Sequence, residues 1–250
     1  MFNGSIVALV TPFDQAGEID FPALRKLVEF HLDRGTNGLV IAGTTGESVS
    51  LTPVEFCDVL DRVTDEVAGR IPVIAGTGSA STVRAIEQTR LAEKHHADAA
   101  LVVTPYYNKP PQAGLRAHFT AVADAAGLDL LLYNVPSRTA IDMLPATVES
   151  LSGHPRIVGL KEAVPDGARI EELCARCGPE FSVLSGDDGS CLDAMRQGAA
   201  GVVSVAANVA PGPMHGLCMA AAQHDWPEAD QLQSRLKPLF DVLMIETNPI

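Results

Sequence analysis

The chain has 250 residues, of which 46% are hydrophobic, so it can enclose a sizeable core within a single domain. Its 18 basic and 31 acidic residues give a net charge of −13 without any cluster of lysine and arginine, which argues against a nucleic-acid or anionic-membrane partner. No apolar run is long enough to cross a bilayer. Composition therefore favours a small-molecule partner.

The first residues and the cysteines indicate the compartment. The segment 1–13 has five apolar residues in a row and no basic residue before them, so we interpret it as a first strand rather than a signal peptide. The five cysteines are scattered and odd in number, which is typical of a reducing cytoplasm. Cys174 and Cys177 form an isolated C-x-x-C pair without further ligands, so we expect no metal site and a cytoplasmic protein.

Short apolar runs rich in valine, isoleucine and leucine recur eight times along the chain. Because these runs are continuous rather than alternating, they indicate strands that are buried on both faces, as in a parallel sheet. The predicted strands are 6–10, 39–42, 72–75, 99–103, 130–133, 157–160, 182–184 and 201–205.

Amphipathic stretches separate the predicted strands, with apolar residues at spacings of three and four and charged residues between them. They predict helices at 21–34, 53–68, 81–95, 114–126, 145–151, 168–177 and 190–198, followed by 213–222 and 227–245. Eight strand-helix units predict an α/β protein, a (β/α)8 TIM barrel over 1–210, with a C-terminal helical region over 211–250 packed on it. A doubly wound open sheet is the alternative, because periodicity does not register closure.

Lys161 is the one cation in the apolar run of the sixth predicted strand, whereas the other four lysines lie in polar contexts. Burying an ammonium group is unfavourable unless the group is paired or neutralised. A lysine held at this position is therefore expected to act as an amine nucleophile. The alternative is a lysine that reaches water at the strand end, beside Glu162.

Polar residues gather after the predicted strands, where the active sites of parallel barrels are built. After the second strand, the segment 43–48 offers the hydroxyls of Thr44 and Thr45 beside backbone amides expected to open the next helix. This arrangement suits a small carboxylate, and an ordinary helix cap is the alternative. The segment 76–79 lacks the third glycine of a dinucleotide-binding loop, so no nucleotide cofactor is expected.

All three tyrosines follow or end predicted strands. Tyr106 and Tyr107 lie in a proline-bounded loop after the fourth strand, and Tyr133 ends the fifth. A hydrogen-bonded phenol can relay protons, and Arg138 on the next loop can bind a carboxylate through two parallel hydrogen bonds. After the seventh strand, Gly186 allows backbone to approach a ligand. Core packing or surface pairing remains the alternative for each residue taken alone.

Together these groups form the minimum set for Schiff-base chemistry on a 2-keto acid. They comprise an amine nucleophile, hydroxyl groups that move protons and a cradle for a carboxylate. The iminium itself serves as the electron sink, so the chemistry requires no metal and no organic cofactor.

The motifs VTPYYNKP, LYNVPSRT, GTTGES, IAGTG, GLKEA and LSGDD together resemble those of the dihydrodipicolinate synthase family of pyruvate aldolases. The resemblance runs from Gly4 to Ile250. It implies a TIM barrel in which Lys161 forms an imine with pyruvate, whose carboxylate lies on Thr44 and Thr45. The implied reaction joins pyruvate to L-aspartate 4-semialdehyde and gives 4-hydroxy-tetrahydrodipicolinate, the first committed step of the diaminopimelate route to lysine.

The same resemblance implies roles for the other site residues. Arg138 would hold the carboxylate of the aldehyde substrate, and the backbones of Gly186 and Val203 would line the pocket. The implied proton relay consists of Tyr133, Thr45 and Tyr107. Tyr107 would reach the site from a neighbouring subunit of a homotetramer or dimer, so assembly would be part of the active site.

Two departures from the family pattern carry expectations. Members inhibited by lysine generally have asparagine and glutamate where this chain has Ala80 and Arg84, so lysine is not expected to inhibit. Family chains also continue beyond Ile250, so the C-terminal helical extension is expected to be truncated, with weaker stability or assembly.

Two alternatives remain open on the sequence. The first is another pyruvate-dependent aldolase, of the N-acetylneuraminate lyase or 2-keto-3-deoxy-sugar-acid type, which would take a polyol aldehyde. Arg138 and the tyrosine pair favour a short carboxylated aldehyde instead. The second alternative is a weakly active or inactive homologue.

Overall fold

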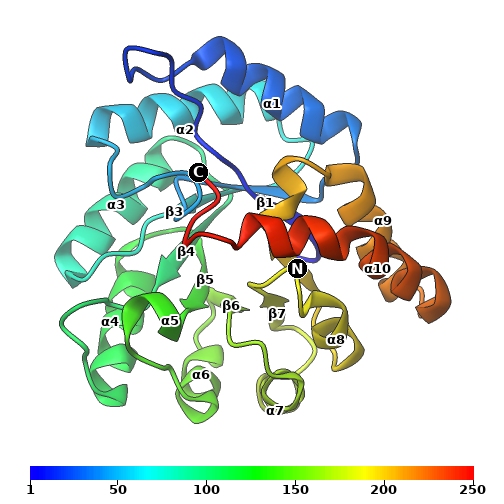
Figure 1. Ribbon diagram of the computed structural model, residues 1–250. Helices are drawn as coiled ribbons and strands as arrows, with labels where there is room; N and C mark the ends of the chain where they lie inside the picture. The colour runs from blue at the N-terminus through cyan, green and yellow to red at the C-terminus, as the bar shows by residue number, and fades with distance from the viewer.

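The computed structural model describes residues 1–250, in which eight parallel strands close into a barrel in the order β1 to β8 (Figure 1). The strands are β1 (Gly4–Ala8), β2 (Gly38–Ile41), β3 (Val73–Gly76), β4 (Ala99–Val103), β5 (Asp129–Asn134), β6 (Ile157–Glu162), β7 (Ser182–Ser185) and β8 (Gly201–Ser204). The predicted (β/α)8 barrel is confirmed. The open sheet is excluded because β8 pairs with β1.

The outer layer consists of helices that lie within a few residues of the predicted ranges. They are α1 (Phe21–Asp33), α2 (Pro53–Val67), α3 (Thr82–Lys94), α4 (Gln112–Ala125), α6 (Pro145–Ser152), α7 (Gly167–Cys177), α8 (Cys191–Arg196), α9 (Pro211–Ala222) and α10 (Trp226–Leu243). The sequence did not predict α5 (Pro136–Thr139) or the 3-10 helix η1 (Ala206–Asn208). Both are too short to show helical periodicity.

The buried hydrophobic residues form two separate clusters, one on each side of the strands. The larger, of 51 residues, fills the space between the strands and the helices. The smaller, of 11 residues, fills the barrel interior and includes Leu131 and Tyr133 of β5 and Val203 of β8. Successive side chains on a strand point to opposite faces. Neighbouring residues of one strand therefore face different clusters, one inside the barrel and one under the helices.

The barrel closes where its first and last strands meet at two glycines. A Cβ atom added to Gly201 would lie 2.1 Å from the carbonyl oxygen of Gly4, so no side chain fits there. The pairing then runs from Gly4 opposite Gly201 to Val7 opposite Ser204. Glycine at this seam lets the two backbones approach closely enough to complete the ring.

The last two helices pack onto the barrel. Leu217 of α9 and Phe240 of α10 belong to the larger hydrophobic cluster. Figure 1 shows the end of the chain passing from α10 across the opening of the barrel. None of the helices is both long and apolar enough to span a membrane.

Candidate active site

A cavity of about 590 Å³ lies at the end of the barrel formed by the carboxyl ends of the strands. Its walls are built from the loops that follow most of the strands, as expected for a parallel barrel. Six of the eight residues predicted for the site line it: Thr44, Thr45, Tyr133, Arg138, Lys161 and Gly186.

Lys161 lies at the base of this cavity with only 6% of its surface exposed. It is paired in register with Tyr133 of the neighbouring strand, and its Nζ lies 4.3 Å from the centre of the tyrosine ring. Lys161 forms no ion pair, because Glu162 points to the other side of the strand and pairs with Arg169. The alternative of a lysine that reaches water beside Glu162 is therefore excluded.

Gly186 leaves the space in which the lysine side chain lies. A Cβ atom at this position would be 3.0 Å from Lys161 Cε and 2.9 Å from Ala163 Cβ, both closer than ordinary contacts. The amide of Gly186 donates a 2.7 Å hydrogen bond to the carbonyl of Glu162. The loop after β7 is thus held directly against the end of β6.

The segment 43–48 after β2 is a series of turns and does not open a helix, so that part of the prediction is wrong. The next helix begins at Pro53, and Thr52 caps it through a capping box with Glu55. Thr45 is buried and Thr44 is exposed, and neither hydroxyl bonds to another protein group in the structure. Neither threonine therefore caps a helix, and the helix-cap alternative is excluded for both.

Arg138 lies on α5 at the rim of the cavity, where it is exposed. Its Nη2 donates a 2.9 Å hydrogen bond to the carbonyl oxygen of Thr247. Met244 from the same C-terminal segment also lines the cavity. The end of the chain therefore contributes to the wall beside Arg138.

Two predicted residues lie outside the cavity wall. Tyr107 is 94% exposed and does not line the cavity, which is lined instead by the adjacent Tyr106. Val203 is buried in the barrel interior, and Val205 takes the place at the cavity wall.

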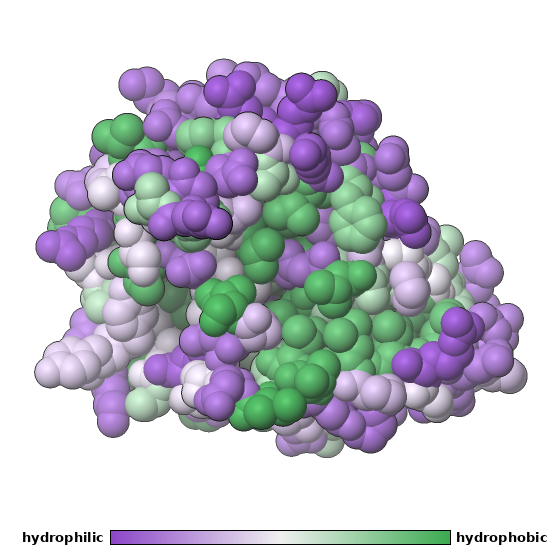
Figure 2. Space-filling view, turned by 45° about the horizontal axis from the view of Figure 1, so that its top comes forward, coloured by the Kyte–Doolittle hydropathy of each residue, from purple (hydrophilic) through white to green (hydrophobic).

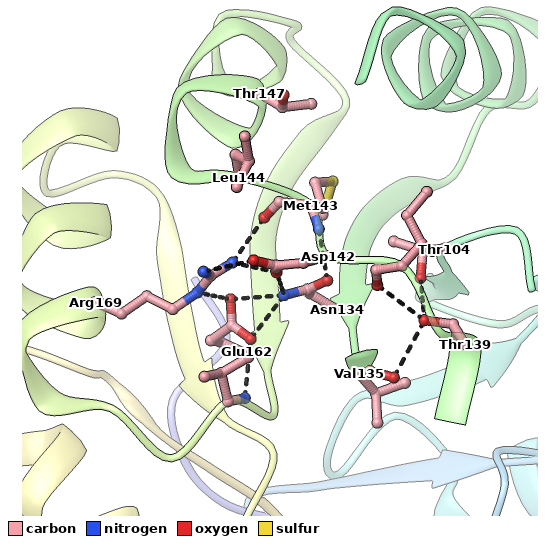
Figure 3. A network of polar contacts seen from close by, with 12 residues as sticks. Thr104, Asn134, Val135, Thr139, Asp142, Met143, Leu144, Thr147, Glu162 and Arg169 are labelled. Atoms are coloured by element: carbon pink, nitrogen blue, oxygen red, sulfur yellow. Dashed lines mark hydrogen bonds and ion pairs between the residues drawn. The ribbon is translucent and has the colours of Figure 1, made fainter. Parts of the chain in front are cut away.

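A polar network that is largely buried was not predicted from the sequence. It joins Asn134, Asp142, Glu162 and Arg169 on the outer side of β5 and β6 (Figure 3). Burial raises the pKa of the Glu162 carboxyl, and the Arg169 guanidinium opposes that shift. Burial also works against the charge on Arg169, but Glu162 and Asp142 outweigh it and raise the pKa of the guanidinium. The one feature of the sequence that could have indicated this network is the acidic residue directly after Lys161, in an otherwise apolar run.

The site combines an unpaired amine, a phenol and a threonine hydroxyl around one enclosed space. Such a set supports nucleophilic addition of the amine to a carbonyl and proton transfer by the adjacent hydroxyls. A closed parallel barrel with a buried lysine facing this cavity defines the class as barrel enzymes of the lysine-dependent aldolase type. The sequence matches the Dihydrodipicolinate synthetase family over residues 1–250, and the chain belongs to that family.

Individual relatives agree with this assignment along the whole chain. The 4-hydroxy-tetrahydrodipicolinate synthase of Pseudomonas aeruginosa is 52% identical over 250 residues, which cover all of this chain and 86% of that protein. The crystal structure of dihydrodipicolinate synthase from Aquifex aeolicus is 48% identical with a TM-score of 0.97, covering all of this chain and 85% of that one. The enzyme from Acinetobacter baumannii, solved in complex with pyruvate, is 44% identical with a TM-score of 0.98, covering all of this chain and 86% of that one.

Proposed function

We propose that Lys161 is the amine nucleophile through which this chain condenses pyruvate with L-aspartate 4-semialdehyde. The chain is a lyase with the activity of a 4-hydroxy-tetrahydrodipicolinate synthase, as its family and its relatives of about 50% identity support. One observation carries the role of Lys161: its side chain is buried, without an ion-pair partner, in a cavity shared with Tyr133 and Thr45. The proposed localisation is cytoplasmic, which the five free thiols support.

The proposed reaction begins with attack of the neutral Lys161 amine on C2 of pyruvate. The carbonyl oxygen leaves as water and an iminium forms, with the pyruvate carboxylate on Thr44 and Thr45. Loss of a proton from the methyl carbon gives an enamine, which attacks the aldehyde carbon of the second substrate. The substrate's amino group then adds to C2, the ring closes and Lys161 is released as the free amine.

The hydroxyl groups around Lys161 are proposed to move the protons in these steps. The aromatic ring of Tyr133 lies directly over Nζ, and its hydroxyl forms no bond to another protein group. Thr45 lines the same cavity with its hydroxyl equally unengaged. Both groups are therefore available to a bound substrate, and Tyr107 from a neighbouring subunit would complete the relay.

Arg138 is proposed to bind the carboxylate of the aldehyde substrate, and Gly186 and Val203 to shape the pocket around pyruvate. Arg138 and Lys161 line the same cavity, with Arg138 exposed and Lys161 buried, so a substrate bound there can contact both. A guanidinium matches a carboxylate through two parallel hydrogen bonds. This feature favours a short carboxylated aldehyde over the polyol aldehydes of the alternative aldolases.

Self-association is proposed because Tyr107 does not serve the cavity of its own subunit. Its exposed side chain is available to a second copy, in a homodimer or homotetramer. Figure 2 shows hydrophobic residues gathered over a continuous area of one face, which is typical of interaction surfaces. Large hydrophobic side chains that remain exposed include Val209, Val242 and Ile245.

Borohydride trapping tests the nucleophile. Incubation with pyruvate and borohydride is expected to add a reduced pyruvate group to Lys161, located by peptide mass spectrometry. Folded protein that shows no adduct would support the inactive homologue. A parallel assay with L-aspartate 4-semialdehyde or a sugar aldehyde separates the aldolase types, since condensation with the semialdehyde alone is expected.

Complementation tests the shared site. Lys161→Ala and Tyr107→Phe proteins are each expected to have low activity, and their mixture, after subunit exchange, to regain part of it. The regain arises because a mixed assembly holds some sites with both native residues. If mixing restores nothing although native mass spectrometry shows oligomers that contain both variants, Tyr107 does not act across subunits.

A further inference from the structure

The ends of β5 and β6 carry two pairs of polar residues on opposite faces. Tyr133 and Lys161 pair in register and face the cavity, and the next residues, Asn134 and Glu162, pair in register on the outer face. Figure 3 shows Asn134 and Glu162 beside each other, with Arg169 of α7 bonded to Glu162. Whatever fixes Asn134 against Glu162 therefore also fixes Tyr133 against Lys161.

Asn134 is fully buried, and both ends of its side-chain amide are engaged. Its Nδ2 donates to both carboxylate oxygens of Glu162, at 2.9 and 3.1 Å, and to Asp142 Oδ1 at 2.8 Å. Its Oδ1 accepts a 2.9 Å bond from the amide of Met143. This residue ties the end of β5 both to β6 and to the segment that leads into α6.

Glu162 and Arg169 form the charged part of the network. The Glu162 side chain is fully buried, and it accepts a 2.8 Å bond from Arg169 Nε and a 3.0 Å bond from the amide of Val164. Arg169 also holds Asp142 through both of its Nη atoms, at 2.7 and 3.1 Å. Every contact to the Glu162 oxygens comes from an N–H group, which suits the ionised carboxylate.

The register of these two strands needs to be held, because it changes earlier in the pair. Leu130 lies opposite Ile157, whereas Leu131 lies opposite Gly159, so β6 contains one extra residue at a bulge. A shift of one residue turns every later side chain to the other face. Such a shift in β6 would remove Lys161 from the cavity.

We propose that Asn134, Glu162 and Arg169 are positioning residues for the reaction, which hold β5 and β6 in the register that sets the Lys161 amine against the Tyr133 ring. This inference rests on the proposed role of Lys161. None of the three residues lines the cavity, so they act through Lys161 and Tyr133 and not on the substrate. Their hydrogen bonds fix the strand ends on the side away from the chemistry.

The test compares Glu162→Gln and Arg169→Lys with the control Arg176→Gln. Arg176 lies on the same helix as Arg169 and binds Glu149 of α6, so the control removes an ion pair between α6 and α7 without touching β5 or β6. The measurements are kcat per Lys161 that borohydride can trap, KM for each substrate, the pH dependence of the trapping rate, and Tm.

Glu162→Gln is expected to lower kcat and the trapping rate per site about 10- to 100-fold, since small displacements of a reacting group cost this much. Arg169→Lys keeps the charge but loses the forked geometry, so a smaller fall is expected. Arg176→Gln is expected to stay within about twofold. KM for the aldehyde is expected to change little, because Arg138 lies on α5 outside the network.

The inference is overturned if Glu162→Gln and Arg169→Lys keep wild-type kcat and trapping rate per site, whatever happens to Tm. That result would assign the network a role in stability alone. If Glu162→Gln does not fold, Arg169→Lys decides the question by the same criterion. A wild-type protein that fails to trap pyruvate would instead contradict the proposed function, so the two failures are distinguishable.

Discussion

The two faces of β5 and β6 treat their polar residues in opposite ways. On the inner face, the Lys161 amine and the Tyr133 hydroxyl have no hydrogen-bond or ion-pair partner within the protein. On the outer face, one residue further along, Glu162 and Asn134 are fully buried and bonded on all sides. Groups left unpaired are available to a substrate, and groups that are saturated hold the backbone. The comparison teaches that neighbouring residues on the same two strands differ in whether the protein itself satisfies their polar groups.

Removal of the amine is the strongest test of the inner face. Lys161→Met is expected to lower kcat at least about a thousandfold, because a thioether forms no imine. The same change is expected to raise Tm, since it replaces a buried polar group that has no hydrogen-bond or ion-pair partner by an apolar side chain of similar size. Coupled assay and thermal denaturation measure the two effects. Loss of both activity and stability would contradict the interpretation that the Lys161 side chain has no stabilising polar partner.

Arg169→Met tests the outer face in the opposite direction. It leaves the Glu162 carboxylate buried without its cation, so the free energy of unfolding is expected to fall by about 3–5 kcal/mol. Urea denaturation at pH 7 measures the change. If Arg169→Met were as stable as Lys161→Met, the proposed difference between the stabilising outer face and the unpaired inner face would be wrong.

Tyr133→Phe separates the hydroxyl of the inner face from its ring. The ring that lies against Lys161 Nζ is kept, so Tm and the final extent of pyruvate trapping are expected to stay near wild type. Loss of the hydroxyl is expected to lower kcat about 100-fold, as for other groups that transfer protons. If Tyr133→Phe and the wild type had equal kcat values, Tyr133 would not take part in proton transfer.

Two histidines in the helix layer extend the comparison to acid stability. Burial lowers the pKa of both His31 and His118 to about 4, and each ring leaves its Nε2 unpaired. Their folded pKa lies below the ordinary value of 6.5, so the unfolded chain binds protons first and stability is lost as pH falls from 6.5 toward 4. Each histidine is expected to lower the free energy of unfolding by about 2 kcal/mol between pH 7 and pH 5.

Urea midpoints at pH 7 and pH 5 measure this loss. The double variant His31→Gln with His118→Gln is expected to show a smaller decrease between the two pH values. His96 is exposed, so His96→Gln serves as the control and is expected to keep the wild-type decrease. An unchanged decrease in the double variant would place the acid sensitivity elsewhere.

The smallest expected effect is the response to lysine. Ala80 and Arg84 stand where inhibited members of the resembled family carry asparagine and glutamate, so millimolar lysine is expected to leave the rate unchanged. A coupled assay over a range of lysine concentrations measures this. A clear inhibition curve would contradict the prediction.

The barrel and most of the cavity were predictable because their signals are periodic or local. Eight continuous apolar runs were sufficient to place the strands, and the polar residues after them were sufficient to place Lys161, Tyr133 and Thr45 at one end. The alternation of faces then followed from strand geometry. The match to a known family agreed with these features.

The remaining features depend on contacts between distant segments. The network around Glu162 joins residues from β5, β6, α7 and the segment before α6, and no spacing in the sequence indicates that they meet. The bulge after Leu130 leaves no pattern of its own. The turns at 43–48 resemble a helix start until the capping box at Thr52 is considered.

The glycine seam between β1 and β8 has a consequence for the newly made protein. The strands that meet at Gly4 and Gly201 are separated by almost the entire barrel sequence, so the ring closes only after the eighth strand is available. Contacts of such long range form late, because the intervening chain must first be ordered. Gly186 and Val205, which line the cavity with Lys161, also follow it in the chain. The cavity around Lys161 is therefore complete only when the last strand pairs with the first.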